Sequence, residues 1–354
     1  MHRSVFFVLV FSVVLGTGIV FSSHHWFTVW VGLELNTLSI VPILCGSFSP
    51  RNVESSVKYF LIQSVSAAVI LNVVVIQAWL YSSWSISQPL GGYTSLLMTF
   101  AIGLKLGLFP CHYWFPDVIQ GVGFLQGLAL STWQKLAPFV VLANVVDSLE
   151  VSVLACLGML SVLVGGWGGL NQTQVRKVLA FSSIAHMGWI CSTVGYSLSG
   201  GCVMLLVYVI INSGVFLLAG EYDLKSLSHV GRLSYFNYGG AVCLALGVLS
   251  LGGLPPLFGF SIKFVSLSCL VASGSFLLAG VLVLGSLLSL FFYLRVAFNS
   301  MLVLFPQHSM VIFGWRSLSS NPKGVTTLRG FTLSLSVGLS LFGLCCFPVL
   351  FSFL

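Results

Sequence analysis

The sequence Gly-Gly-Leu-Pro-Pro at residues 252–256 interrupts a long apolar stretch that otherwise runs from residue 238 to residue 275. Adjacent prolines stop an α-helix because proline lacks the backbone N–H and its ring clashes with the preceding turn. Seven residues beyond Pro256 the apolar sequence contains a lysine, Lys263. Irregular backbone at membrane depth is tolerated only where it is buried in protein or lines a wet cavity. The stretch therefore predicts a discontinuous membrane helix with a charged side chain beside its break.

A second interruption of the same kind lies in the first half of the chain. An apolar run ends near Phe109 and is followed by Pro-Cys-His-Tyr-Trp-Phe-Pro-Asp at 110–117, with Lys105 about one turn before the first proline. Two discontinuous helices in corresponding places are typical of transporters built from inverted repeats. We predict such helices near residues 105–117 and 252–263; the alternative is a pair of ordinary loops.

The composition excludes a soluble protein. Of the 354 residues, 57% are hydrophobic and 6% are charged, and the mean hydropathy is +1.06. Soluble domains carry about 25% charged residues, so 14 basic and 7 acidic side chains cannot cover a soluble surface of this size. A soluble enzyme, a nucleic-acid-binding domain and a disordered chain are excluded. Long unbroken apolar runs predict an all-α, polytopic membrane helical bundle.

The number and orientation of the membrane spans follow from apolar runs and loop charges. If residues 238–275 count as one broken element, the positive-inside rule favours about eleven spans, with the N-terminus on the cytoplasmic or matrix side and the C-terminus opposite. The runs form a single transmembrane domain, residues 1–354, without a soluble domain. The apolar runs lie at 4–22, 26–46, 57–81, 94–109, 123–146, 150–170, 178–196, 200–220, 238–254, 257–275, 276–299 and 329–351. The basic residues assigned to the side of the N-terminus are Arg3, Arg51, Lys58, Arg176, Lys177, Lys225, Arg232, Arg295, Arg316, Lys323 and Arg329.

Four charged residues remain inside the apolar runs: Glu34, Lys105, Lys135 and Lys263. Each costs at least ~2.5 kcal/mol if it faces lipid, so all four are expected to face the bundle interior or water. Desolvation favours the neutral amine, and an amine poised between its charged and neutral forms suits a proton relay. His186, in the middle of a span, can also hold or pass a proton. The alternative is that these side chains form only structural ion pairs and hydrogen bonds.

Other kinds of site lack their motifs. The sequence contains no nucleotide-binding G-x-x-x-x-G-K-[ST], no H-E-x-x-H, no G-x-S-x-G and no C-x-x-C. A haem would need paired histidines within the spans, and only His186 is clearly in the middle of one. We therefore predict no metal and no redox cofactor in this chain.

Four motifs together resemble one protein family. They are Trp-Val-Gly-Leu-Glu-Leu-Asn-Thr-Leu-Ser-Ile at 30–40, Ser-Thr-Trp-Gln-Lys-Leu-Ala-Pro at 131–138, Ser-Ser-Ile-Ala-His-Met-Gly-Trp at 182–189 and Gly-Leu-Pro-Pro-Leu-Phe-Gly-Phe-Ser-Ile-Lys-Phe at 253–264. The chain resembles, from about residue 26 to residue 300, the chain 2 family of mitochondrial NADH–ubiquinone oxidoreductase. Members of this family are antiporter-like membrane subunits of respiratory complex I.

The resemblance implies a proton-translocating subunit of NADH:ubiquinone reductase in the mitochondrial inner membrane, with its N-terminus in the matrix and its C-terminus on the intermembrane side. NADH, FMN, iron–sulfur clusters and ubiquinone are then expected in partner subunits, and none of these cofactors in this chain. The expected partners are other membrane-arm subunits, including neighbouring antiporter-like chains, and lipids such as cardiolipin, with no nucleic acid.

The resemblance also implies roles for five residues. Glu34 matches the family's glutamate, and Lys105 and Lys263 match the lysines of the two broken helices. Lys135 matches the central lysine, and His186 the bridging histidine. Opening or closing of the Glu34–Lys105 pair would change the proton affinity of Lys105, since a unit charge at 4 Å is worth roughly 4 kcal/mol at ε ≈ 20. A proton would then pass by Lys135 and His186 to Lys263. A stand-alone cation/proton antiporter and a purely structural membrane subunit are the alternatives.

Overall fold

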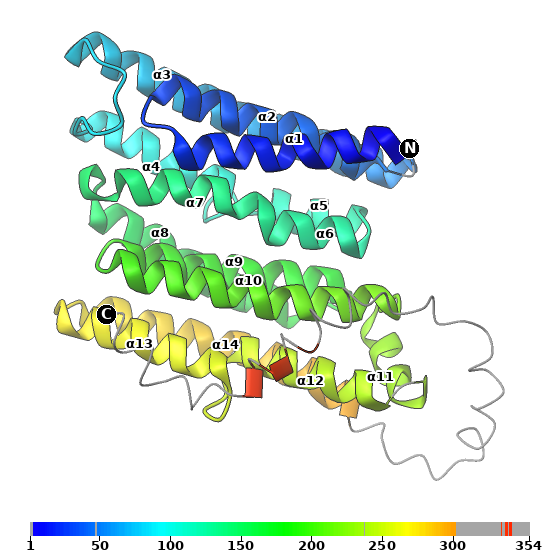
Figure 1. The fold of residues 1–354 in the computed structure, drawn as a ribbon. Helices are drawn as coiled ribbons and strands as arrows, with labels where there is room; N and C mark the ends of the chain where they lie inside the picture. The colour runs from blue at the N-terminus through cyan, green and yellow to red at the C-terminus, as the bar shows by residue number, and fades with distance from the viewer. Residues whose placement is uncertain are drawn as a thin grey trace. The chain divides into compact units, whose positions relative to one another are not determined.

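The computed structural model describes residues 3–46, 48–236 and 238–301, together with positions 334, 337, 338, 340 and 341. Apart from two single-residue bridges, this part of the chain contains helices and no strands, which confirms the all-α class (Figure 1). The helices are α1 (Arg3–Ser22), α2 (Trp26–Cys45), α3 (Pro50–Tyr81), α4 (Gly92–Leu106), α5 (Trp114–Gly121), α6 (Phe124–Ser131), α7 (Trp133–Val145), a short 3-10 helix η1 (Val146–Ser148), α8 (Val151–Leu170), α9 (Val175–Val194), α10 (Leu198–Glu221), α11 (Leu227–Phe236), α12 (Tyr238–Gly252), α13 (Phe258–Ala272) and α14 (Phe276–Met301).

The helices have the length and composition of membrane spans. In the described part of the chain, α1, α2, α3, α8, α10 and α14 are long and apolar enough to cross a bilayer, and α4, α12 and α13 are shorter apolar helices. The predicted count of eleven spans stays a prediction. The predicted last span, 329–351, and the basic positions 316, 323 and 329 lie outside the continuously described ranges.

The chain divides into two compact units. The first comprises residues 1–161 and 187–198, and the second comprises residues 162–186 and 199–354. In the first unit α2 packs between α1 and α3, α3 also contacts α4 and α5, and α7 contacts α1, α2, α4 and α6. In the second unit α14 packs against α11, α12 and α13. The interrupted helix α4/α5 lies in the first unit, and the interrupted helix α12/α13 lies in the second.

Both predicted breaks are present, and both begin at a glycine. Helix α4 ends at Leu106, where Gly107 adopts a left-handed φ of +75°, and α12 ends at Gly252, followed by Gly253 with φ +81°. Residues with a Cβ rarely adopt this conformation, so glycine is the favoured residue there. The first helix therefore ends at Leu106, four residues before Pro110 and within the predicted interval 105–117.

The structure corrects one predicted span. The run 123–146 was expected to be continuous, but it is divided into α6 and α7 at Thr132. The hydroxyls of Ser131 and Thr132 both donate to the Leu128 carbonyl, at 3.1 and 2.7 Å, and so compete with the helical backbone bond to that oxygen. Pro138 also deprives the Gln134 carbonyl of its helical donor. The turn that carries Lys135 is consequently irregular.

In the second unit, an arginine on α14 closes the end of α8. Arg295 Nη1 donates to the Leu170 carbonyl at 2.9 Å, and Nη2 donates to the Gln172 carbonyl. The last carbonyls of a helix lack backbone donors and carry partial negative charge, so a guanidinium is favoured there.

Replacing Arg295 by Met is expected to lower stability by about 1.5–3 kcal/mol, because two carbonyls lose a charged donor. Arg295→Lys should recover part of the loss, since an ammonium keeps the charge but not the planar pair of donors. Thermal unfolding in detergent micelles measures both. A midpoint for Arg295→Met equal to that of the unmodified protein would contradict this role.

Candidate functional site

The buried ionisable side chains form two separate clusters, one in each unit. Lys105, Lys135, His186 and Lys263 are all buried, between 3% and 9% exposed. Lys105 and Lys135 line one cavity in the first unit, and His186 and Lys263 line another in the second unit. Each cavity has room for about one or two water molecules. The structure thus brings the predicted residues together in two pairs.

The cavity of the first unit, called here the two-lysine cavity, lies between the ends of interrupted helices. Lys105 occupies the last turn of α4, where a cation is favoured by the helix dipole. Lys135 lies in the first turn of α7, with its Nζ 4.7 Å from the centre of the Phe115 ring, a favourable cation–π distance. The cavity is lined by Tyr59, Gln63, Lys105, Leu106, Trp114, Phe115, Leu130, Gln134 and Lys135.

Glu34 stands beside this cavity and does not line it. It lies on α2, is half-buried, and accepts a hydrogen bond from Thr37 Oγ1 at 3.1 Å. Its charge acts on Lys105 and on Tyr59. Within the described residues no ion pair of 4.0 Å or less joins Glu34 to Lys105. The expected pair is therefore electrostatically linked and not in contact.

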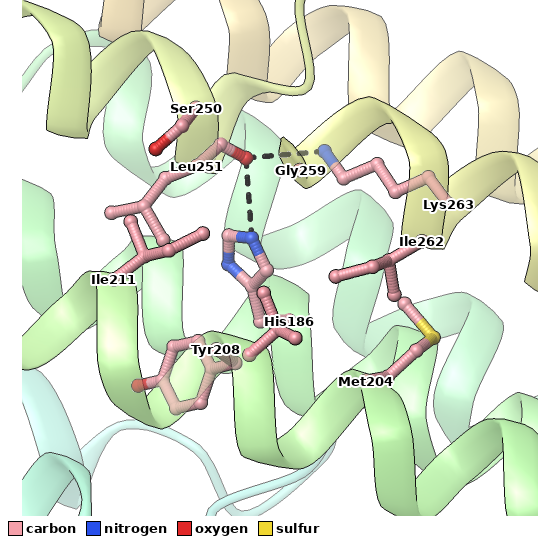
Figure 2. Close-up of a pocket in the computed structure, with 10 residues that line it drawn as sticks. His186, Met204, Tyr208, Ile211, Ser250, Leu251, Gly259, Ile262 and Lys263 are labelled. Atoms are coloured by element: carbon pink, nitrogen blue, oxygen red, sulfur yellow. Dashed lines mark hydrogen bonds between the residues drawn. The ribbon is translucent and has the colours of Figure 1, made fainter. Parts of the chain in front are cut away.

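The cavity of the second unit, called here the histidine–lysine cavity, is built on the second break. Figure 2 shows Lys263 of α13 and His186 of α9 approaching the same backbone oxygen, that of Leu251. Lys263 Nζ donates to the carbonyls of Leu251 and Gly252, at 3.3 and 3.0 Å. These carbonyls end α12 and lack helical donors, so the break itself supplies the acceptors for the buried amine. The lining residues are His186, Met204, Val207, Tyr208, Ile211, Ser250, Leu251, Gly259, Ile262 and Lys263.

Both ring nitrogens of His186 face carbonyl oxygens. Nδ1 is 2.7 Å from the Ser182 oxygen, and Nε2 is 3.2 Å from the Leu251 oxygen. A carbonyl oxygen only accepts, so whichever ring nitrogen carries a proton has an acceptor within reach. The ring is held by Tyr208, stacked at 5.2 Å between centroids, and by the edge contact with Tyr293 at 6.4 Å. A proton on either nitrogen of the histidine can therefore be hydrogen-bonded.

Sequence reasoning missed the polar neighbours of these residues. Tyr59, Gln134 and Tyr208 line the cavities, yet a lone tyrosine or glutamine in an apolar run gives no signal of its partners. His112, at the first break, is also buried, with its ring 4.1 Å from that of Tyr113. Among the described residues no group of three or more His, Cys, Asp or Glu side chains is placed to hold a metal ion.

Comparison with known proteins gives consistent similarities. A sequence model of the family described as NADH:quinone oxidoreductase/Mrp antiporter, transmembrane, matches residues 23–289. NADH-ubiquinone oxidoreductase chain 2 of the sea star Patiria pectinifera is 71% identical over the full length of both chains. The chain 2 protein of Salmo salar is 42% identical, with 94% of this chain and 96% of the relative covered.

Solved structures show the same fold. A chain of respiratory complex I from Thermus thermophilus superposes with a TM-score of 0.85 at 26% identity, covering 99% of this chain and 80% of that chain. A chain of the Mrp complex from Dietzia superposes with a TM-score of 0.80 at 20% identity, covering 97% of this chain and 75% of that one. The second likeness concerns the fold alone.

Proposed function

We propose that this chain, which belongs to the NADH–ubiquinone oxidoreductase chain 2 family, moves protons along Glu34, Lys105, Lys135, His186 and Lys263. It is an antiporter-like membrane-arm subunit of respiratory complex I and a multi-pass protein of the mitochondrial inner membrane. We further propose that its N-terminus faces the matrix. Oxidation of NADH and reduction of ubiquinone, with FMN and the iron–sulfur clusters, belong in this proposal to partner subunits.

The burial of three lysines and a histidine in two cavities among apolar helices is the observation that carries the proposal. No Asp or Glu is among the described lining residues of either cavity. Desolvation disfavours the charge of a buried amine, so its charged and neutral forms lie closer in free energy than they do in water. Such an amine can be loaded and emptied by a modest change in the field around it.

Glu34 is proposed to provide that change in field. The carboxylate acts on Lys105 from a distance greater than an ion pair. Since the Coulomb energy varies inversely with distance, an approach of Glu34 favours the charged form of Lys105 and a retreat favours proton release. The released proton is taken up by Lys135 at the same cavity. Movement of α2 relative to α4 would therefore control the loading of the first cavity.

His186 and Lys263 are proposed to form the outlet. The imidazole can carry a proton on both nitrogens, and the lysine shares one of its acceptors, the Leu251 oxygen. Positive charge on one of the two groups disfavours positive charge on the other, because both lie within hydrogen-bond reach of one atom. Arrival of a proton at His186 thus promotes its departure from Lys263. Neighbouring antiporter-like chains and lipids such as cardiolipin are the proposed partners around this relay.

Replacing Lys105 by Met tests the relay. We expect the variant complex to assemble, to retain electron transfer in the presence of an uncoupler, and to translocate fewer protons per electron pair. The loss should be partial, because Lys135 remains at the same cavity. Proton uptake and NADH oxidation are measured together in liposomes that contain the purified complex. The control is Lys58→Met, which removes an exposed lysine paired with Glu54 at 2.7 Å.

Two other outcomes would contradict the proposal and favour a different function. An unchanged proton-to-electron ratio together with reduced assembly would support a structural subunit. Migration of this chain alone, outside the NADH-oxidising band of a native gel searched by mass spectrometry, would support a stand-alone cation/proton antiporter.

A further inference from the structure

Three uncharged side chains form a hydrogen-bonded chain beside the two-lysine cavity. Tyr59 Oη donates to Gln134 Oε1 at 3.2 Å, and Gln134 Nε2 donates to Asn36 Oδ1 at 2.9 Å. The three residues come from α3, α7 and α2, so the glutamine amide joins three helices. Tyr59 and Asn36 are each 2% exposed. This chain is called here the amide bridge.

The amide bridge uses both ends of the Gln134 side-chain amide. Its carbonyl oxygen accepts from the tyrosine hydroxyl, while its NH2 group donates to the asparagine oxygen. The amide of Gln134 can bond to both partners, whereas an aliphatic side chain at this position could bond to neither.

The bridge connects the two helices whose charges the proposed relay uses. Gln134 immediately precedes Lys135, and Asn36 lies two residues after Glu34. Tyr59 and Gln134 line the cavity that holds Lys105 and Lys135. Any shift of α2 that moves Glu34 also moves Asn36, and through the amide it pulls on the turn that carries Lys135.

That turn of α7 is weakly held by its own backbone. Pro138 cannot donate to the Gln134 carbonyl, and at Thr132 the chain leaves regular helical geometry. Lys135 N instead donates to the Thr132 carbonyl over three residues, at 3.3 Å. Side-chain bonds from α2 and α3 consequently decide where this turn lies. An amide does not ionise at physiological pH, so the bridge can transmit position and cannot itself carry the proton.

We infer that Gln134 is a positioning residue that ties Lys135 to the Glu34-bearing helix α2, through its hydrogen bonds to Asn36 and Tyr59. The inference rests on the proposed function, because it states how a movement of α2 reaches the lysine at the first cavity. It adds a mechanical link to the electrostatic one between Glu34 and Lys105. Both would respond to the same displacement.

Gln134→Leu tests the inference in the purified complex reconstituted in liposomes. The leucine keeps apolar volume but breaks both bonds of the bridge. We expect the number of protons translocated per electron pair to fall by roughly twofold or more, since each neutral hydrogen bond contributes a several-fold bias between arrangements. Uncoupled NADH oxidation should be retained. Tyr59→Phe removes one donor and keeps the ring, so it should show a smaller fall.

The double variant and a matched glutamine separate positioning from general damage. Because both changes act on one bond, Tyr59→Phe added to Gln134→Leu should cause no further fall. Gln77 is a buried glutamine of α3 that donates to the Pro89 carbonyl at 2.5 Å and accepts from Thr94 at 3.3 Å. Gln77→Leu should reduce the amount of assembled complex and leave the proton-to-electron ratio unchanged.

An unchanged ratio in assembled Gln134→Leu overturns the inference. If that variant does not assemble, an unchanged ratio in Tyr59→Phe overturns it. Equal reductions of the proton-to-electron ratio in Gln134→Leu and Gln77→Leu also overturn the inference. Loss of any buried amide would then have the same effect. If Lys105→Met and Lys263→Met lower the ratio while Gln134→Leu does not, only this inference fails. If the lysine variants leave the ratio unchanged, the proposed function itself fails.

Discussion

Lys263→Met is expected to stop proton translocation through this chain, the largest functional effect that the structure predicts. Among the described lining residues of the histidine–lysine cavity, Lys263 is the only lysine. Its loss therefore leaves that cavity without a lysine, whereas loss of Lys105 leaves Lys135 in the two-lysine cavity. A positioned proton donor and acceptor contributes roughly 10²-fold or more to a proton-transfer rate. The proton-to-electron ratio of the reconstituted complex should fall further than in Lys105→Met, with uncoupled electron transfer retained.

Two further variants decide whether Lys263 acts by its proton or by its hydrogen bonds. Lys263→Arg keeps donors for the Leu251 and Gly252 carbonyls, but a guanidinium does not release its proton. It should therefore assemble well and still fail to translocate protons. A normal proton-to-electron ratio in Lys263→Arg would show that the lysine acts only by its hydrogen bonds to the carbonyls at the end of α12. Lys225→Met, which removes an exposed lysine paired with Asp223 at 2.8 Å, is the matched control and should behave as the unmodified chain.

Gly259→Ala is expected to produce the largest loss of stability. A Cβ at this position would lie 1.7 Å from the backbone oxygen of Ser250 and 2.8 Å from its carbonyl carbon. Backbone atoms cannot move aside as the end of a flexible side chain can, so α13 must shift away from α12. Overpacking of this kind costs about 3 kcal/mol or more. The amount of assembled complex and its thermal midpoint should both fall.

Gly280→Ala provides the control for this change. Gly280 lies in α14, is exposed, and has open space where its Cβ would be. Alanine there should stabilise the helix by up to ~1 kcal/mol, because glycine is the poorer helix former. If Gly259→Ala assembled as well as Gly280→Ala, α12 and α13 would not be in close contact at Gly259, and the prediction would be wrong.

The helical fold and its two breaks could be predicted because they depend on local chemistry. Runs of about 20 apolar residues, glycines and prolines specify a membrane helix and its end whatever the surrounding fold. The interruption at Thr132 could not be found in this way. It depends on two hydroxyls that share one carbonyl and on a proline six residues further along, each of which a continuous helix tolerates by itself. The single membrane domain, the inverted repeats and the eleven spans stay predictions.

The burial of Lys105, Lys135, His186 and Lys263 could be predicted, but which of them share a cavity could not. A charge in an apolar run is conspicuous in a sequence because lipid does not tolerate it. Which charges meet depends on how helices pack, as α4 does against α7 to bring Lys105 and Lys135 to one cavity. The resemblance implied that Glu34 and Lys105 form a pair that opens or closes, and among the described residues no ion pair of 4.0 Å or less joins them. Backbone acceptors such as the Leu251 carbonyl cannot be recognised from a sequence, because every residue type has a carbonyl.

The length of α3 has a consequence for where the two-lysine cavity lies in the bilayer. Its 32 residues span about 48 Å at 1.5 Å each, against a hydrocarbon thickness of ~30 Å. The surplus must be taken up by tilt or by projection among the lipid headgroups. The polar first turns, which carry Glu54 and Lys58, suit the projecting end. If the whole surplus projects at this end, Tyr59 lies about 14 Å along the helix, near the edge of the hydrocarbon. Thicker bilayers, which draw this helix inward, should slow proton entry more than thinner ones.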